Sequence, residues 1–332
     1  MTEPPAPAQT IPWVRLGADS HWLAVMGVLT AIEFGWWVIA WRAGIAPVPF
    51  VGTYLILTFA GLALTLAARL GLRMGRPVPS WPSIIAGTLL VAVGASLFLP
   101  LKYAIPAEIP FWLDRPLMVA ERAVFGDDPW LVLDRILGWA TRPIDWLYGC
   151  WLPTQLLIMF SVMLSRPSPA KSRALIAYSL GWFVLGTVAA ALLSSAGPIF
   201  FDRAFGGSGF AELHDALHAR GAWVAIAESD RMWASTGMDR PGLVAGISAM
   251  PSIHVAISLW VVLATRQMKP RFAPMAWAYF VLIWIGSVQL AWHYVSDGFV
   301  GALGMWVIWR LVGIWDWGFG RASPDAAVGL RD

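Results

Sequence analysis

Eight long apolar stretches dominate this chain and limit what it can fold into. Each is close to the roughly 20 mostly apolar residues that a helix needs to span a bilayer. They are residues 21–41, 50–70, 83–101, 144–164, 174–194, 252–268, 273–292 and 296–315. The chain is 58% hydrophobic and 13% charged, whereas soluble domains are about 45–50% apolar and about 25% charged. The sequence therefore predicts an all-α polytopic membrane protein with about eight transmembrane helices.

Basic residues in the short loops predict the orientation of these spans. They follow the second, fourth and sixth stretches and recur in the C-terminal tail, as Arg69, Arg73, Arg76, Arg166, Lys171, Arg173, Arg266, Lys269, Arg271, Arg321 and Arg331. With eight spans all of them lie on one side, which the positive-inside rule assigns to the cytoplasm. Both termini are then cytoplasmic, and the long segments 102–143 and 195–251 face the outside.

The apolar stretches also suggest how the chain is organised. We expect a two-span extension, a six-span core and a cytoplasmic tail, over residues 1–80, 81–320 and 321–332. Segment 113–137 mixes apolar and charged residues, as do helices that lie in the membrane interface. The sequence has no basic block of the kind that would predict nucleic-acid binding. With Cys150 as its single cysteine it cannot form an intramolecular disulfide.

Two histidines stand at the predicted outer ends of neighbouring spans. His254 begins the sixth stretch, and His293 follows the seventh with Asp297 four residues later. If this segment is helical, His293 and Asp297 share a face, and the carboxylate can fix the imidazole tautomer and raise its basicity. Such an imidazole can act as a nucleophile, and the second one can protonate a leaving oxygen. Ser252, near a helix start, is a candidate ligand for a phosphate oxygen.

These residues carry a resemblance to a known family. Pro251-Ser252-Ile253-His254 and His293-Tyr-Val-Ser-Asp297 resemble the second and third signature motifs of the type-2 phosphatidic acid phosphatase superfamily. The resemblance implies a six-helix membrane core and a phosphohistidine intermediate. It assigns His293 as the nucleophile, Asp297 as its partner and His254 as the general acid.

Within that superfamily, the chain looks most like the branch that contains inositol phosphorylceramide synthase, a sphingolipid phosphotransferase. Ile253 before the motif histidine, where glycine is usual elsewhere, is similar to that branch. The context of residues 246–254 is similar to bacterial members, which implies a bacterial inner membrane.

Two cationic positions of the family pattern are not matched. The first motif, Lys-x6-Arg-Pro, is not evident, and Ser287 stands where an arginine usually precedes the third-motif histidine. Because the family clamps phosphate with these cations, another residue must do so here. The candidates are Arg203, just outside the fifth stretch, and Arg231 and Arg240 upstream of His254.

The predicted reaction needs a lipid phosphate or phospholipid as donor, in contact with membrane lipids, and no metal or other cofactor. Water as acceptor makes the protein a phosphatase, and a lipid or sugar alcohol makes it a transferase. The residues do not decide between them, although the branch resemblance favours transfer.

Other functions remain open on the sequence. A transporter or channel should carry ionisable groups near mid-span, but the spans hold few, of which Glu33 is the clearest, and this argues against such a function. Lipid scrambling without chemistry stays open. A haem protein with His254 and His293 as axial ligands would show a Soret band. His214 and His218 have a metal-ligand spacing but no obvious third ligand, and an ordinary interfacial helix explains them better.

Overall fold

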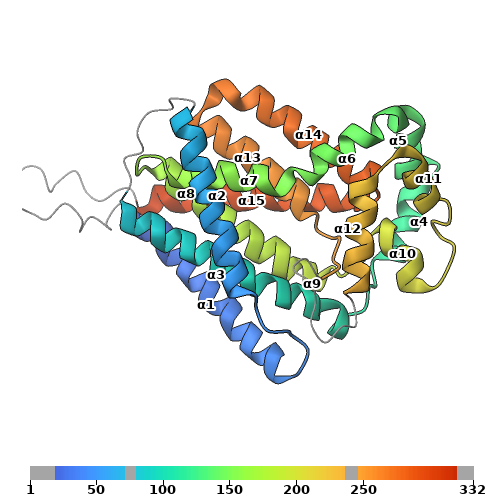
Figure 1. The fold of residues 1–332 in the computed structure, drawn as a ribbon, viewed down its shortest axis with the longest axis horizontal. Coiled ribbons are helices and arrows are strands. Elements are labelled where there is room, and N and C mark those ends of the chain that lie inside the picture. The colour runs from blue at the N-terminus through green and yellow to red at the C-terminus, as the bar shows by residue number, and fades with distance from the viewer. Residues whose placement is uncertain (1–18, 72–79, 236–245, 320–332) are drawn as a thin grey trace, which may run out of the picture.

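The computed structural model describes residues 19–71, 80–235 and 246–319, and these residues form helices and connecting segments without a β-strand. The prediction of an all-α polytopic membrane protein is confirmed. Five helical segments, α7, α8, α13, α14 and α15, run roughly along the long axis of the molecule, and shorter helices cover one end of them (Figure 1).

Six helical stretches in the described part of the chain are long and apolar enough to cross a membrane. They are α1 (Ser20–Arg42), α2 (Val51–Gly71), α3 (Trp81–Glu108), the continuous run Pro169–Leu192, the run Pro270–Gln289 and the Val295–Ile314 part of α15 (Val295–Phe319). The run Pro169–Leu192 joins α8 (Pro169–Leu180) to α9 (Ala190–Leu192) through a π-helical stretch, Gly181–Ala189. The run Pro270–Gln289 contains a short 3-10 turn and α14 (Ala273–Gln289).

The two other predicted spans are less regular than the sequence suggested. Stretch 144–164 belongs to a helix pair, Pro129–Gly149 and Trp151–Met163, that bends by 42°. This pair contains α5 (Pro129–Leu137), α6 (Thr141–Gly149) and α7 (Trp151–Met163). Stretch 252–268 becomes α13 (Ile253–Met268), whose 16 residues measure about 24 Å, less than the hydrocarbon thickness of about 30 Å. The count of spans is therefore six, or seven with the bent pair, by length and composition.

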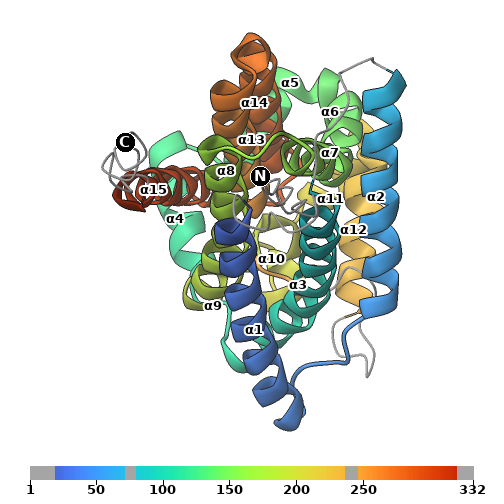
Figure 2. The same ribbon diagram turned by 90° about the vertical axis from the view of Figure 1, so that its left-hand side faces the viewer.

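Helix α13 is the centre of the core. It contacts α7, α8, α14 and α15, and Figure 2, which looks along the bundle, places these helices around it. Its side chains are buried on nearly every face, including Val255, Ala256, Ile257 and Trp260. Helices α1 and α2 instead leave many of their large side chains exposed, as lipid-facing helices do. Helix α2 is steeply inclined to the long axis in Figure 1 and lies on the opposite side of the molecule from α15 in Figure 2.

A cap of short helices covers the end of the bundle at which α13 and α15 begin (Figure 1). It consists of α4 (Asp114–Phe125), α5, α10 (Pro198–Phe205), α11 (Leu213–Arg220) and α12 (Trp223–Ala234). Ion pairs hold it together, with Arg122 Nε 2.6 Å from Asp128 Oδ1 and Arg220 Nε 2.9 Å from Asp134 Oδ1. The segment 113–137, for which we expected interfacial helices, forms α4 and α5, which contact α15 and α14.

At the opposite end, a buried ion pair attaches the N-terminal helix to the core. Lys171 Nζ lies 3.0 Å from Asp19 Oδ1, and both side chains are almost fully buried. The Trp22 indole donates to the same carboxylate oxygen at 2.9 Å. Because a buried charge is costly without its partner, this pair fixes the start of α1 against α8. The predicted tail, 321–332, lies outside the described residues.

Candidate active site

The two histidines lie next to each other beneath the cap. His254 is the second residue of α13, and His293 lies in the turn between α14 and α15. Their ring centroids are 5.6 Å apart with planes inclined at 60°. The start of α13 and the turn between α14 and α15 thus bring together two imidazoles that are 39 positions apart in the sequence.

Aromatic side chains hold the His254 ring in place. The Trp151 ring lies 4.2 Å from it and the Tyr148 ring stacks on it at 4.9 Å, both measured between centroids. The Trp151 indole also donates to the His254 carbonyl at 3.1 Å. These contacts restrict the ring to one orientation.

Asp297 stands behind His293, although not in the way that the sequence suggested. His293 Nδ1 is 3.4 Å from Asp297 Oδ2, but α15 begins only at Val295, so the pair does not share a helix face. Asp297 is the third residue of α15, and its carboxylate accepts the backbone N–H of Tyr294 at 3.0 Å, which is half of a capping box. The condition of a continuous helix over both residues is therefore not met. The two side chains lie close together because α15 begins directly after His293.

Backbone hydrogen bonds fix the turn that carries His293. The His293 N–H donates to the Ser287 carbonyl at 3.1 Å, and the Ser252 N–H donates to the Asp297 carbonyl at 3.0 Å. The second bond joins the start of α13 directly to the first turn of α15. His293 is 6% exposed, and Asp297 is fully buried. The distance between the imidazoles therefore depends on main-chain contacts and not on flexible side chains.

His293 is neutral in this setting. Burial and, second to it, the Lys102 ammonium lower the pKa of His293 to about 3, against the opposing effect of a backbone hydrogen bond with Ala249. A neutral imidazole keeps a lone pair on one nitrogen, which is the form that a nucleophile or a general base requires.

Lys102, near the end of α3, is the cation that sequence analysis missed. Its charge acts on both His254 and His293. Gly246, at φ +94°, lets the segment before His254 approach the α3 backbone, where an added Cβ would come within 2.9 Å of the Lys102 carbonyl carbon. A signal existed in the sequence, because Lys102 is followed after six residues by Ile109-Pro110. The segment Lys102–Pro110 thus has the lysine and the proline of the pattern Lys-x6-Arg-Pro, with Ile109 in place of the arginine.

The three predicted arginines have other surroundings. Arg203 Nη2 is 2.5 Å from Asp230 Oδ1 on the partly exposed surface between α10 and α12. Arg231 pairs with Glu228 within α12. Arg240 falls in 236–245, outside the described residues. Neither Arg203 nor Arg231 contributes to the electrostatic environment of His293 as Lys102 does.

Ser252 caps a helix in this structure. It is the N-cap residue of α13, and its hydroxyl accepts the N–H of Val255 at 3.4 Å. Its side chain is fully buried. Ser252 therefore helps to place His254, two residues further on, at the beginning of the helix.

Two carboxylates of α4 complete the surroundings of the turn. Asp114 accepts the N–H groups of Ala196 and Gly197 at 2.7 and 2.9 Å, and the Tyr294 hydroxyl at 3.3 Å. Burial raises the pKa of Asp114 to about 6, and the hydrogen bonds limit that rise. Glu121 accepts both the N–H and the hydroxyl of Ser296, at 2.8 and 2.7 Å. In the sequence these residues look like ordinary charges of an interfacial helix, so nothing there singles them out.

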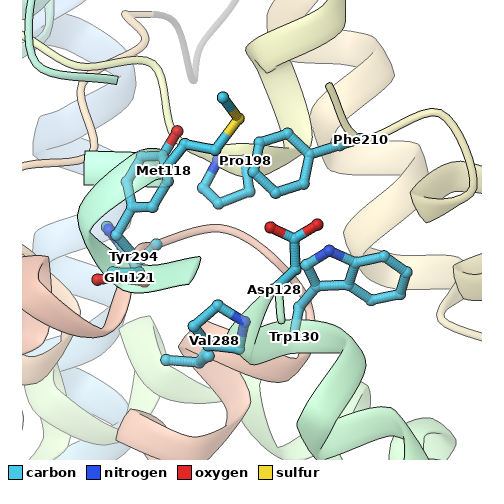
Figure 3. A pocket seen from close by; sticks show the side chains of 10 residues that line it. Met118, Glu121, Asp128, Trp130, Pro198, Phe210, Val288 and Tyr294 are labelled. Atoms are coloured by element: carbon cyan, nitrogen blue, oxygen red, sulfur yellow. The ribbon is translucent and has the colours of Figure 1, made fainter. Parts of the chain in front are cut away.

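A small pocket adjoins His293 on the side of the cap. Glu121, Asp128, Trp130 and Tyr294 contribute to its lining (Figure 3), together with His293 itself. Its volume of about 10 Å³ is enough for about one water molecule. Glu121 Oε2 and Trp130 Nε1 have no hydrogen-bond partner in the structure, so the pocket offers one acceptor and one donor close to the imidazole.

The structure gives His214 and His218 ordinary contacts. His214 Nε2 is 3.3 Å from the Ile199 carbonyl, and the His218 ring packs edge-on against Trp223 with centroids 5.7 Å apart. Among the described residues, no group of three or more His, Cys, Asp or Glu side chains is placed to hold a metal ion.

The fold and this site define a class: a polytopic helical membrane protein with two facing histidines and a carboxylate behind one of them. A family model described as the PAP2 superfamily matches residues 115–311, more than half of the chain. The chain therefore belongs to the PAP2 superfamily. No curated protein and no solved structure matches it. Membership makes it a membrane lipid phosphatase or phosphotransferase in the general sense.

Proposed function

We propose that the protein transfers a phosphoryl or phospho-headgroup from a membrane lipid through a phosphohistidine intermediate on His293. The observation that supports this most directly is the arrangement of His254 and His293, with ring centroids 5.6 Å apart and Asp297 3.4 Å behind His293. This separation allows a phosphorus atom to lie between a nucleophile on one side and a proton donor on the other.

The first step breaks the bond between phosphorus and the leaving oxygen. The lone pair of neutral His293 attacks phosphorus and forms an N–P bond, while His254 gives its proton to the leaving oxygen. Asp297 stabilises the positive charge that develops on the His293 ring, as the carboxylate does in a catalytic triad. His254 enters this step with its proton, and the Tyr148 and Trp151 rings hold it in place.

The second step reverses these roles. An acceptor hydroxyl attacks the phosphorus of the intermediate, His254 removes its proton, and the N–P bond breaks. His293 is then neutral again, and atoms and charge balance over the cycle. Well-placed acid–base catalysis of this kind contributes about 10²–10⁴ in rate.

Lys102 is our candidate for the phosphate-binding cation in place of the missing arginines. An ammonium close to both imidazoles stabilises the charge on the phosphoryl oxygens as the N–P bond forms. Arg203 and Arg231 are bound to carboxylates, and we assign them to the stability of the cap. Ser252 acts on the site by placing His254.

Water and an alcohol remain the two candidate acceptors. The resemblance to the inositol phosphorylceramide synthase branch favours transfer to a lipid or sugar alcohol. The pocket beside His293 has about 10 Å³ and admits only water, so an alcohol has to enter along the path of the lipid donor. We infer from the distribution of basic residues that the site faces the extracytoplasmic side of a bacterial inner membrane, with both termini in the cytoplasm. This topology requires the bent pair and the short helix α13 to cross the membrane as well.

Purified protein incubated with radiolabelled lipid phosphates, with and without alcohol acceptors, tests the proposal. Hydrolysis releases inorganic phosphate, transfer produces a new phosphodiester, and a rapid acid-labile, base-stable label on the protein identifies phosphohistidine. A His293→Ala protein that folds and still becomes labelled would overturn the mechanism. A scramblase without chemistry would move lipids between leaflets while producing neither product.

A further inference from the structure

The end of the bundle opposite the histidines contains a second, larger cavity. It lies between α8, α13 and α15, has a volume of about 440 Å³, and is lined by Arg173, Arg266, Gln267, Trp306, Trp309 and Arg310. We call it the arginine cavity. Arg310 is 15 residues along α15 from Val295, which corresponds to about 22 Å from the histidine end. It is therefore separate from the candidate active site.

Two of the arginines that line the cavity, Arg266 and Arg310, are exposed and can receive an anion. Among the side chains that the structure describes, no Asp or Glu lines the cavity, and Arg266 and Arg310 form no ion pair. Two guanidinium groups at the edge of one space repel each other, and an anion between them relieves this repulsion. Guanidinium matches phosphate oxygens in geometry and can bind them with two parallel hydrogen bonds.

Packing holds one of the arginines in place. Arg173 donates from Nε and Nη2 to the Trp309 carbonyl at 3.2 and 2.8 Å, and its guanidinium lies 4.6 Å from the centroid of the Trp309 ring. Gly313 leaves the space for it, because a Cβ there would collide with the guanidinium. Part of the cavity is therefore formed before any ligand arrives, which lowers the cost of binding.

The surroundings of the cavity suit a lipid better than a free anion. Leu303, Val307 and Leu311 are exposed on α15 at intervals of four residues, so they form an apolar stripe beside Trp306 and Arg310. An acyl chain can lie along this stripe while its headgroup reaches the arginines. Trp306 is exposed beside this stripe, and tryptophan side chains favour the level of lipid headgroups.

We propose that the arginine cavity binds the phosphate headgroup of an anionic phospholipid from the leaflet opposite the active site. By the positive-inside rule this is the cytoplasmic leaflet, where basic pockets between transmembrane helices bind anionic headgroups. The bound lipid lies between α8, α13 and α15.

Lipid retention by the full-length protein tests the site. The protein is purified in mild detergent and titrated with phosphatidylglycerol or phosphatidylcholine, and bound lipid is counted by native mass spectrometry. We expect the wild type to prefer phosphatidylglycerol and the double variant Arg266→Gln, Arg310→Gln to lose about tenfold or more of that affinity. A wild type without this preference, or a double variant that binds as the wild type does, overturns the proposal.

Matched variants separate charge from geometry. Arg271→Gln removes a charge from the loop after α13, outside the cavity, and should change binding by less than about twofold. Arg266→Lys with Arg310→Lys keeps the charges and should recover much of the lost affinity. Gly313→Ala displaces Arg173 without removing a charge and should weaken binding. Equal losses in Arg271→Gln and the double variant would indicate a diffuse effect of net charge and contradict a defined site.

A competition experiment distinguishes a lipid from a free phosphate. Glycerol 3-phosphate carries the same phosphate without acyl chains, so a lipid site should release phosphatidylglycerol only at a large excess of this competitor. Displacement at equal concentrations would show that the cavity takes a soluble phosphate ester and would overturn the assignment to a lipid.

Discussion

The two ends of this helical bundle handle charge in opposite ways. At the histidine end, His293, Asp297 and Asp114 are buried, the carboxylates receive backbone N–H groups, and the adjoining pocket measures only about 10 Å³. At the other end, Arg266 and Arg310 border an open space of about 440 Å³ and form no ion pair with the described residues. The same helices, α13 and α15, supply residues to both.

The difference reflects two kinds of task. Chemistry at phosphorus needs groups held within a fraction of an ångström and protected from water, because their electrostatic effect depends on preorganisation. Recognition of a headgroup needs charge of the correct sign and enough room. We therefore expect substitutions at the histidine end to affect rate and fold strongly, and substitutions at the arginine end to affect lipid binding alone.

The largest effect should come from His293→Ala. Without the nucleophile no N–P bond forms, and loss of a nucleophile lowers kcat by about 10⁴–10⁶ in enzymes where it has been removed. The measurement is release of labelled phosphate or headgroup by the purified variant, with the thermal midpoint as control for folding. Activity within tenfold of the wild type would show that His293 forms no covalent intermediate. The histidine end would then have no catalytic role to distinguish it from the arginine end.

Lys102→Met should have the next largest effect. Loss of one preorganised group that stabilises transition-state charge costs about 10²–10³ in kcat, and Lys102→Arg should recover part of it. The matched control is Arg203→Gln, which removes a cation that is paired with Asp230 and should change kcat less than about threefold. The reverse ranking of the two variants would return the role of phosphate ligand to Arg203.

The pH dependence of stability should reveal the buried carboxyl of Asp114. Because its pKa rises from 3.8 to about 6 on folding, its stabilising contribution is complete below pH 3.8 and is lost as the pH rises through about 6. The total is up to about 3 kcal/mol. Asp114→Asn removes this dependence, so the difference in thermal midpoint between the variant and the wild type should shift in favour of the variant from pH 4 to 7.

Comparison with the wild type is essential in that experiment. His293 has a lowered pKa of about 3, so its stabilising contribution is present above pH 6.5 and is lost as the pH falls. The pH dependence of stability from His293 therefore has the opposite sign to that from Asp114. Because His293 is present in both proteins, its contribution cancels when the variant is compared with the wild type. Parallel pH profiles would mean that Asp114 does not titrate in the folded protein.

Sequence patterns predicted the parts of this structure that depend on local composition. The apolar stretches gave the helical membrane class, and segment 113–137 gave the cap helices α4 and α5. Spacing and resemblance together placed His254 and His293 at one end, where the structure brings them together. The sequence did not reveal the shortness of α13 or the 42° bend near Cys150. A run of apolar residues does not determine where a helix begins or bends.

Long-range contacts explain what sequence analysis could not supply. Lys102 precedes His254 by 152 positions, and only the approach of Gly246 to α3 brings them together. Asp114 and Glu121 act on the turn at Tyr294 and Ser296 through hydrogen bonds that span 180 and 175 positions. Sequence analysis assigned the arginines of the inner loops only a topological role. The positive-inside rule counts arginines near the ends of spans, and this count is the same whether they are scattered or line one cavity.

The smallest effect on catalysis should come from Arg266→Gln with Arg310→Gln. These residues lie about 18–22 Å from the histidine end along α13 and α15, and both are solvent- or lipid-exposed. Exposed charges separated by more than about 10 Å are largely screened at ordinary ionic strength, so kcat in detergent should stay within about twofold of the wild type. A fall in kcat beyond tenfold, at an unchanged thermal midpoint, would show that the two ends are coupled. A lipid in the arginine cavity would then be a regulator of the histidine site. Its bound headgroup would change the rate of the reaction through α13 and α15, the helices that supply residues to both ends.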